Sequence, residues 1–422
     1  MEPATITIII MLFAVVMFIL EKLPLSLTAI IVCTSLAVSG VITPAAAFAG
    51  FVNPAVILFA AMFVIGGAFF ETGMARKVGL LVTRFAKTER QLIVATMIAT
   101  AILSSILSNT ATAAIFIPII IGIADQSGYS RARLLMPMAF TATLGGNLTL
   151  IASPGNLIAH GALGAAGAPQ FGFFDFGLIG LPILIAGGFY FALLGPKLLP
   201  ARAASTTDAA LDQKSPENVP KWKQIVTVSV LLGTILMMTL ESVIGLPLHV
   251  IACIGAIVMV LTKVMTEEKA IKSIDMRVIF LFGGVLPLAT ALEQTGAGMM
   301  ITNAVIGLLG ENATPFALLA AIFFIAVVLT NFISNTATTA LLVPLAITIA
   351  NAMGADPRAA AMATVIGASM ALATPICTPP NVMIYTLGGY RFTDFTKVGL
   401  PLIIIGSTVS LILLPIFFPF FP

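Results

Sequence analysis

Two short polar clusters interrupt apolar segments of the chain. The tripeptide Ser-Asn-Thr occurs at 108–110, within LSNTATAAIFIP, and again at 334–336, within ISNTATTALLVP. Ser, Asn and Thr at a helix start cap its first N–H groups. If helices begin at Ala111 and Ala337, their positive dipole ends face these clusters, and an anion is stabilised there. The two copies therefore predict a pair of anion-binding tips.

Each cluster is followed by an apolar segment with Gly and Pro at its centre, TLGGNLTLIASPGNLI at 143–158 and ALATPICTPPNVMI at 371–384. A proline inside a helix leaves a backbone carbonyl unpaired. Such carbonyls, together with Ser, Thr and Asn oxygens, suit a hard cation such as Na⁺. Sites for an anion and a cation in each half indicate transport. The alternative is that SNT only caps kinked helices and the small residues serve packing, which explains one copy more easily than two.

The composition identifies the solvent of the fold. Hydrophobic residues make up 59% of the 422 residues and charged residues 9%, and the mean hydropathy is +1.12. Soluble domains have about a quarter charged residues, and apolar runs long enough for a hydrocarbon core of about 30 Å recur along the chain. We expect an all-α polytopic membrane protein. A β-barrel is excluded, because these runs are continuous rather than alternating.

A polar segment at 200–223 divides the chain into two halves that repeat the same markers. We expect a first repeat at 1–199, a linker at 200–223 and a second repeat at 224–422. Each half contains five predicted membrane passes, and because five is odd the second repeat should be inverted. The passes are expected at 5–20, 24–42, 54–71, 132–163 and 175–196, and at 224–241, 246–262, 277–293, 359–388 and 398–420.

Between the third and fourth pass of each half, the chain is expected to enter the membrane and return. These re-entrant hairpins cover 91–125 and 315–352, with the SNT tips at their turns, and each precedes a broken helix, at 132–163 and 359–388. The hairpins enter from opposite faces, so both tips approach the midplane. Non-helical backbone at that depth is tolerated only against protein or a water-filled cavity.

The basic residues test this topology. When the loop that carries Arg76, Lys77, Arg84, Lys87 and Arg90 is assigned to the cytoplasm, all of the 20 lysines and arginines except Arg358 fall on that face. Positive charge accumulates on the cytoplasmic side of membrane proteins. The sequence therefore predicts a multi-pass protein of the inner (plasma) membrane, with both termini outside and the linker 200–223 cytoplasmic.

These motifs resemble the divalent anion:sodium symporter (DASS, SLC13) family of the ion transporter superfamily. The paired SNT motifs, the TPPN loop at 378–381 and GGYRFTDFTKVGLPL at 388–402 carry the resemblance, which extends over almost the whole chain. It implies a homodimer in the lipid bilayer, with no nucleic-acid partner and no enzymatic activity. It also implies an elevator mechanism that moves a C4-dicarboxylate such as succinate, malate or fumarate together with Na⁺.

The resemblance also implies roles for individual residues. It places Asn109, Thr110, Asn335, Thr336, Pro375 and Thr378 at the substrate. It assigns one Na⁺ site to Ser104, Ser108, Asn109, Gly145 and Gly146. It assigns the other to Thr330, Ser334, Asn335, Ala373 and Thr374. Departures from the family pattern, such as Asn147 after the first glycine pair, leave the substrate and the Na⁺ stoichiometry open.

Three alternatives remain. The same fold could carry sulfate or citrate, or exchange dicarboxylates without Na⁺. A cation/proton antiporter would need a titratable carboxylate at membrane depth, and its candidates are Glu71, Glu293, Asp175 and Asp394. The topology places no lysine or arginine near the tips, so we expect amides, hydroxyls, helix ends and Na⁺ to bind the anion. Two similar tips favour a substrate with two carboxylates.

Overall fold

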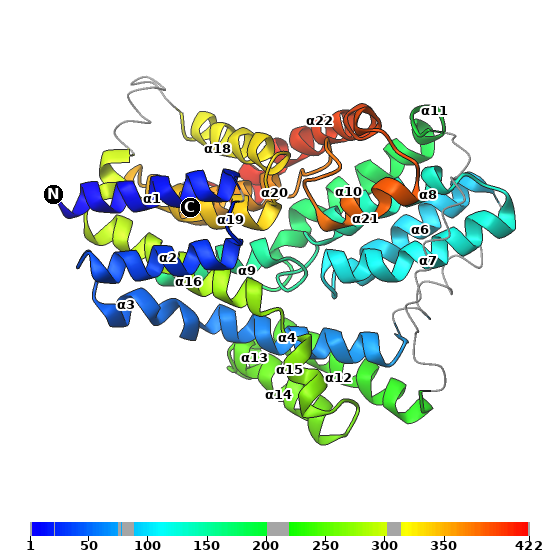
Figure 1. Cartoon of the computed structure of the whole chain (residues 1–422), viewed down its shortest axis with the longest axis horizontal. Helices are drawn as coiled ribbons and strands as arrows, with labels where there is room; N and C mark the ends of the chain where they lie inside the picture. Colours follow the sequence, from blue (N-terminus) through cyan, green and yellow to red (C-terminus); the bar gives the residue numbers. More distant parts are fainter. Residues whose placement is uncertain are drawn as a thin grey trace.

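The computed structural model describes residues 2–20, 22–74, 77, 88–200, 219–301 and 314–420, and all regular secondary structure in these residues is helical (Figure 1). The helices of the first half are α1 (Pro3–Leu20), α2 (Leu25–Val38), α3 (Pro44–Phe48), η1 (Ala49–Val52), α4 (Pro54–Glu71), α6 (Glu89–Ser104), α7 (Asn109–Ser127), α8 (Arg131–Gly145), α9 (Pro154–Ala165), α10 (Asp175–Leu193) and α11 (Gly195–Leu198). Those of the second half are α12 (Lys221–Thr239), α13 (Glu241–Ile244), α14 (Leu248–Leu261), α15 (Glu267–Ser273), α16 (Met276–Gln294), α18 (Pro315–Thr330), α19 (Asn335–Ala352), α20 (Pro357–Ala368), α21 (Pro379–Leu387) and α22 (Phe392–Phe417).

The two predicted hairpins are α6–α7 and α18–α19. Serine caps the second helix of each: Ala111 N donates to Ser108 Oγ over 3.3 Å, and Ala337 N donates to Ser334 Oγ over 3.2 Å. The helices begin at Asn109 and Asn335 rather than at Ala111 and Ala337, so the expected starts were wrong by two residues. The reason is that the serine alone is the N-cap, and the Asn and Thr after it already take helical conformation.

The predicted broken helices are interrupted as expected. In the first half α8 ends at Gly145 and α9 begins at Pro154; in the second, α20 ends at Ala368 and α21 begins at Pro379. Proline stands at the first helical position of α9 and α21, where its missing N–H costs nothing. The residues between the paired helices are not helical, so their backbone groups need partners from elsewhere.

An asparagine from the following helix supplies those partners in each half. Asn156 Nδ2 donates to Gly146 O over 2.7 Å and to Thr149 O over 2.8 Å. Its counterpart Asn381 donates from Nδ2 to the carbonyls of Ala371, over 3.4 Å, and Thr374, over 3.1 Å. Both asparagines are fully buried. The unwound segments are thus held by the same interaction in both halves.

The two halves are interlocked: helices of one half pack against helices of the other along much of their length. Helix α2 lies along α16, α4 along α14 and α10 against α22. The hairpin of each half also contacts the broken helix of the other, since α7 packs on α21 and α19 on α9. This exchange brings the two SNT tips to one place. The inverted relation of the halves and the re-entry of the hairpins into the membrane stay predictions.

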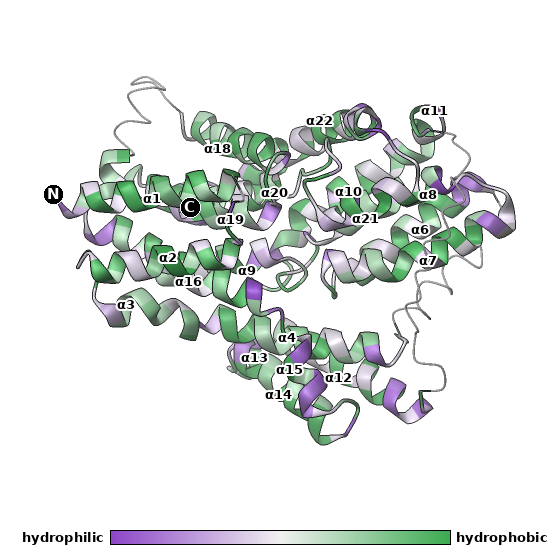
Figure 2. Cartoon of the chain, viewed as in Figure 1, coloured by the Kyte–Doolittle hydropathy of each residue, from purple (hydrophilic) through white to green (hydrophobic). Residues whose placement is uncertain are grey.

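Six helical stretches of the described residues are long and apolar enough to cross a membrane. Five of them are predicted passes, at α4, α10, α12, α16 and α22. The sixth is α19, which we expected to be half of a hairpin. The predicted passes at α1, α2 and α14 are shorter apolar helices. Figure 2 shows hydrophobic residues over most of the helices.

Two predicted features lie largely outside the described residues. These are the basic loop, of which Arg76, Arg84 and Lys87 are not described, and the linker at 201–218.

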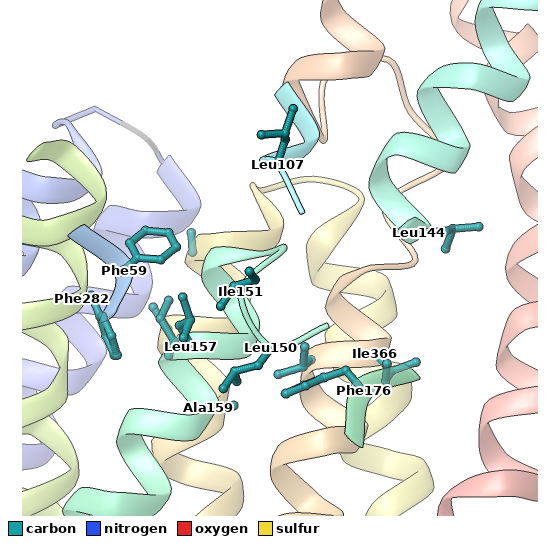
Figure 3. Packing of buried hydrophobic residues seen from close by; sticks show 14 of the residues in the cluster. Phe59, Leu107, Leu144, Leu150, Ile151, Leu157, Ala159, Phe176, Phe282 and Ile366 are labelled. Atoms are coloured by element: carbon teal, nitrogen blue, oxygen red, sulfur yellow. The ribbon is translucent and has the colours of Figure 1, made fainter. Parts of the chain in front are cut away.

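Glycines on α10 and α22 allow the backbone of the unwound segments to pack closely against these helices. A Cβ at Gly180 would collide with the carbonyl oxygen of Asn147, and a Cβ at Gly399 would collide with that of Leu372. Both glycines begin a Gly-Leu-Pro tripeptide, at 180–182 and at 399–401. Apolar side chains fill the rest of this contact: Figure 3 shows Leu150 of the first unwound segment beside Phe176 of α10, both fully buried.

Substituting Gly180 by Ala should therefore destabilise the protein. The added methyl group must displace the Asn147 backbone, and overpacking of this kind costs about 1–3 kcal/mol. We expect a lower apparent Tm of the purified protein in detergent. Gly188→Ala, on the same helix with nothing within 4 Å of the new Cβ, is the matched control and should leave the Tm unchanged or raise it. Equal Tm values for the two variants would contradict the assigned contact.

Candidate functional site

One cavity of about 950 Å³ is lined by both SNT tips. The first tip contributes Ser108, Asn109 and Thr110, and the second contributes Asn335 and Thr336. The unwound segments and the helix starts that follow them complete this part of the wall with Ile151, Ala152, Pro154, Thr378, Pro379 and Pro380. Of the substrate residues that the resemblance implies, the structure brings five together, and only Pro375 is not part of the lining.

Four helices begin at the cavity wall. They are α7 and α19, which start at the tips, and α9 and α21, which start at Pro154 and Pro379. The N-terminus of a helix carries a partial positive charge of about half a unit and free N–H groups. Four such ends around one space favour an anion without any charged side chain.

Thr378 supplies a further donor. Its side chain lies at the wall and is 2% exposed, and its Oγ1 has no hydrogen-bond partner among the described residues. It is the N-cap residue of α21 but does not cap the helix with its side chain. A buried hydroxyl without a partner is costly, and an anionic ligand in the cavity would satisfy it.

The first set of predicted Na⁺ ligands is assembled beside the first tip. Ser104 Oγ lies 2.5 Å from Ala142 O and 3.1 Å from Asn109 Oδ1. A hydroxyl has one proton, and the shorter contact to Ala142 takes it, so Asn109 Oδ1 faces the serine oxygen without a shared proton. Gly146 lies against the same amide oxygen. A side-chain hydroxyl, an amide oxygen and the carbonyl end of α8 form a set of hard, neutral oxygens that fits Na⁺.

The second set is assembled differently. Thr330 Oγ1 donates to Ala368 O over 2.5 Å, as Ser104 does to Ala142. The backbone N–H of Ala373 and the hydroxyl of Thr374 form their hydrogen bonds with Asn331, which is not in the predicted set. Ala373 N donates to Asn331 Oδ1 and Thr374 Oγ1 donates to Asn331 O, each over 2.8 Å.

Asn331 is a residue that the sequence interpretation missed. Its side chain is buried and also donates from Nδ2 to Met370 O over 3.1 Å, so it orders the second unwound segment. Its place directly after Thr330, where the first half has Ser105 after Ser104, was the available signal. A polar amide in place of a hydroxyl marks a difference between the two halves.

A charged region lines another part of the same cavity. It consists of Glu71 at the end of α4, Asp275, and Glu268, Lys269 and Lys272 of α15. Lys269 Nζ lies 2.5 Å from Glu71 Oε2, and Lys272 Nζ lies 2.6 Å from Glu268 Oε1. The expectation that no lysine or arginine lies near the tips stays a prediction; two lysines line another part of the same cavity, each paired with a glutamate. Because both lysines are exposed, this region forms the mouth of the cavity.

The carboxylates proposed for an antiporter have surface surroundings. Glu71 is in the exposed ion pair with Lys269, and Glu293 is exposed. Asp175 accepts from Gly172 N and Asp394 from Arg391 N, and both are partly exposed. None of the four is buried in the interior of the protein. The described residues also contain no cluster of three or more His, Cys, Asp or Glu side chains.

Known transporters are similar to this chain in sequence, and a solved structure is similar to it in fold. The chain is 25% identical to the uncharacterized transporter YfbS of Escherichia coli, over 96% of this chain and 98% of that one. It is 24% identical to the sodium-dependent dicarboxylate transporter SdcS of Staphylococcus saprophyticus, over 90% of this chain and 80% of that one. The crystal structure of the YdaH transporter of Alcanivorax borkumensis matches with a TM-score of 0.62 and 16% identity, and covers 90% of this chain and 87% of that one.

The sequence model of the citrate transporter family, CitMHS, matches residues 15–367. This range includes both SNT tips and the first unwound segment. It agrees with the resemblance to the divalent anion:sodium symporters. Because the match covers most of the sequence, the chain belongs to the CitMHS citrate transporter family and is a multi-pass membrane transporter, not an enzyme.

Proposed function

We propose that the chain is a Na⁺-coupled symporter of a small divalent anion, most simply a C4-dicarboxylate. The observation that carries this proposal is the shared cavity: both SNT tips line it, and four helices begin at its wall. The names of SdcS, a sodium-dependent dicarboxylate transporter, and of the citrate transporter family support the same class of substrate.

The two tips suit a substrate with two carboxylates. Asn109 and Thr110 offer an amide and a hydroxyl on one side, and Asn335 and Thr336 offer the same pair on the other. One carboxylate at each tip uses both sets, whereas sulfate has no second anionic group to place at the other tip. Citrate has a third carboxylate, which would have to face the mouth. The cavity is large enough for a C4-dicarboxylate, sulfate or citrate. The choice among these substrates therefore depends on the number and spacing of their anionic groups rather than on their size.

Na⁺ would supply the positive charge that the tips lack. Ser104, Asn109 and the Gly145–Gly146 segment fit the ion as neutral oxygen ligands. Asn109 belongs to both the cation set and the anion tip, so Na⁺ bound beside it fixes the amide that the carboxylate contacts. This shared residue gives coupling a physical basis.

The predicted orientation also assigns a conformation. The mouth, formed by the end of α4 and by α15, lies on the predicted cytoplasmic face, so the cavity is open inward. The hairpins and broken helices pack on one another across the halves, which suits their movement as one body in the elevator that the resemblance implies. We propose a homodimer in the inner membrane on the same ground.

Truncating either tip asparagine should strongly reduce transport. Asn109→Ala or Asn335→Ala removes a charge-assisted hydrogen bond to a carboxylate, and we expect succinate uptake into proteoliposomes at limiting substrate to fall roughly tenfold or more. Asn351→Ala is the matched control, because this exposed asparagine ends the helix that Asn335 begins. Uptake of malate, citrate and sulfate should be compared in parallel. Wild-type uptake after both tip substitutions would exclude the tips as the binding site.

Ser104→Ala should weaken Na⁺ binding. We expect the Na⁺ concentration for half-maximal uptake to rise about tenfold, because one oxygen ligand is lost, while the KM for succinate at saturating Na⁺ changes little. Ser105→Ala is the control, since that hydroxyl donates only to Ile102 O of its own helix, over 2.8 Å. Wild-type uptake that ignores Na⁺ and requires internal dicarboxylate would replace the symporter by the exchanger.

A further inference from the structure

A buried hydrogen bond joins the two unwound segments across the halves. Ser369 Oγ lies 2.8 Å from Asn147 Oδ1. Asn147 is 1% exposed and Ser369 is 4% exposed. Each residue lies just beyond the end of a helix, α8 for Asn147 and α20 for Ser369. The contact therefore links the carbonyl ends of two helices that stop in the interior of the protein.

Asn147 is adjacent in sequence to the first predicted cation set, and Ser369 is adjacent to two residues whose carbonyls accept from Thr330 of the second set and from Asn331 beside it. Asn147 follows Gly146, which lies against Asn109 Oδ1. Ser369 lies between Ala368, which accepts from Thr330, and Met370, which accepts from Asn331. The contact therefore links the segment beside the first set to the segment beside the second set.

The counterpart positions cannot form the same bond. Asn156 donates to Gly146 O in the first half, and its counterpart Asn381 donates to Ala371 O in the second. Gly146 and Ala371 are therefore at corresponding positions, and the residue that corresponds to Asn147 is Leu372. In the same way, Ser104 donates to Ala142 O and Thr330 donates to Ala368 O. Ala142 and Ala368 correspond, so the residue that corresponds to Ser369 is Thr143. Leucine has no polar atom, and Thr143 Oγ1 donates back to Ala139 O over 3.2 Å. The hydrogen bond between Asn147 and Ser369 therefore has no counterpart at the corresponding positions of the two halves.

The contact has two possible arrangements. Ser369 Oγ lies 2.9 Å from Val365 O as well as 2.8 Å from the Asn147 amide, and it has one proton to donate. The serine either donates to Asn147 Oδ1, or donates to Val365 O and accepts from Asn147 Nδ2 after the amide rotates. As placed, Asn147 Nδ2 has no partner among the described residues. Either arrangement keeps a hydrogen bond between Asn147 and Ser369, so the two segments stay joined in both.

We infer that Asn147 and Ser369 are positioning residues that couple the two Na⁺ sites, so that occupation of one promotes occupation of the other. This inference rests on the proposed Na⁺ symport. Neither side chain lines the cavity, and both act through the unwound segments. Cooperative activation by Na⁺ depends on their contact.

The test is the Na⁺ dependence of succinate uptake in proteoliposomes by the wild type, Asn147→Leu, Ser369→Ala and the double variant. Asn147→Leu introduces the residue of the counterpart position and keeps the branched shape and the number of side-chain heavy atoms. We expect the Hill coefficient for Na⁺ to exceed unity in the wild type and to fall towards unity in all three variants. The half-maximal Na⁺ concentration should rise by about fivefold, with an unchanged KM for succinate at saturating Na⁺. The Hill coefficient does not depend on how much protein folds.

Two controls separate coupling from general damage. Thr143→Ala removes the counterpart hydroxyl and should keep the wild-type Hill coefficient. Ser369→Thr retains the hydroxyl and should restore cooperativity. The double variant should be no worse than either single variant, because all three lose one shared contact.

The outcomes are distinguishable. A wild type whose uptake ignores Na⁺ overturns the proposed symport and this inference with it. A Na⁺-dependent wild type with a Hill coefficient of unity, or variants that keep the wild-type coefficient, overturns the coupling alone. Additive losses in the double variant also overturn it, since they show that the two side chains act separately.

Discussion

The fold depends on keeping two unwound segments inside an apolar protein. Backbone carbonyls there have no helical partners, and leaving one unpaired in a low-dielectric interior costs several kcal/mol. Asn156 and Asn381 meet this constraint with paired donations to the segments that precede them. Once the segments are held, α8 and α20 end in the interior, and α9 and α21 begin there. Helix ends in the interior carry partial charges, so they can form an ion site without charged side chains.

The exchange of contacts between halves turns two such arrangements into one site. Each tip lies in the same cavity as the unwound segment of the other half, because α7 packs on α21 and α19 on α9. Figure 3 shows apolar side chains of this arrangement, with Leu157 and Ile151 of the first half near Phe59 and Phe282. The halves differ at Asn331 and Asn147, so the repeat supplies the architecture and single residues supply the asymmetry.

Much of this could be predicted from the sequence, because periodic and local signals carry it. The SNT tips, the Gly and Pro breaks and the apolar runs locate hairpins and broken helices within a few residues. The helix starts at Asn109 and Asn335 were missed, because capping by serine alone decides them. The pairing of Lys269 with Glu71 and the role of Asn331 were missed because they depend on contacts between distant segments. No local pattern encodes such contacts.

The central claim is that one anion contacts both tips at once. A cryo-EM map of the protein in a bilayer nanodisc with Na⁺ and succinate tests it most directly. We predict density for the anion between Asn109 and Asn335, within hydrogen-bonding distance of both, with a cation beside Ser104. Density for succinate only at the mouth, near Lys269 and Lys272, or against a single tip, would contradict the account.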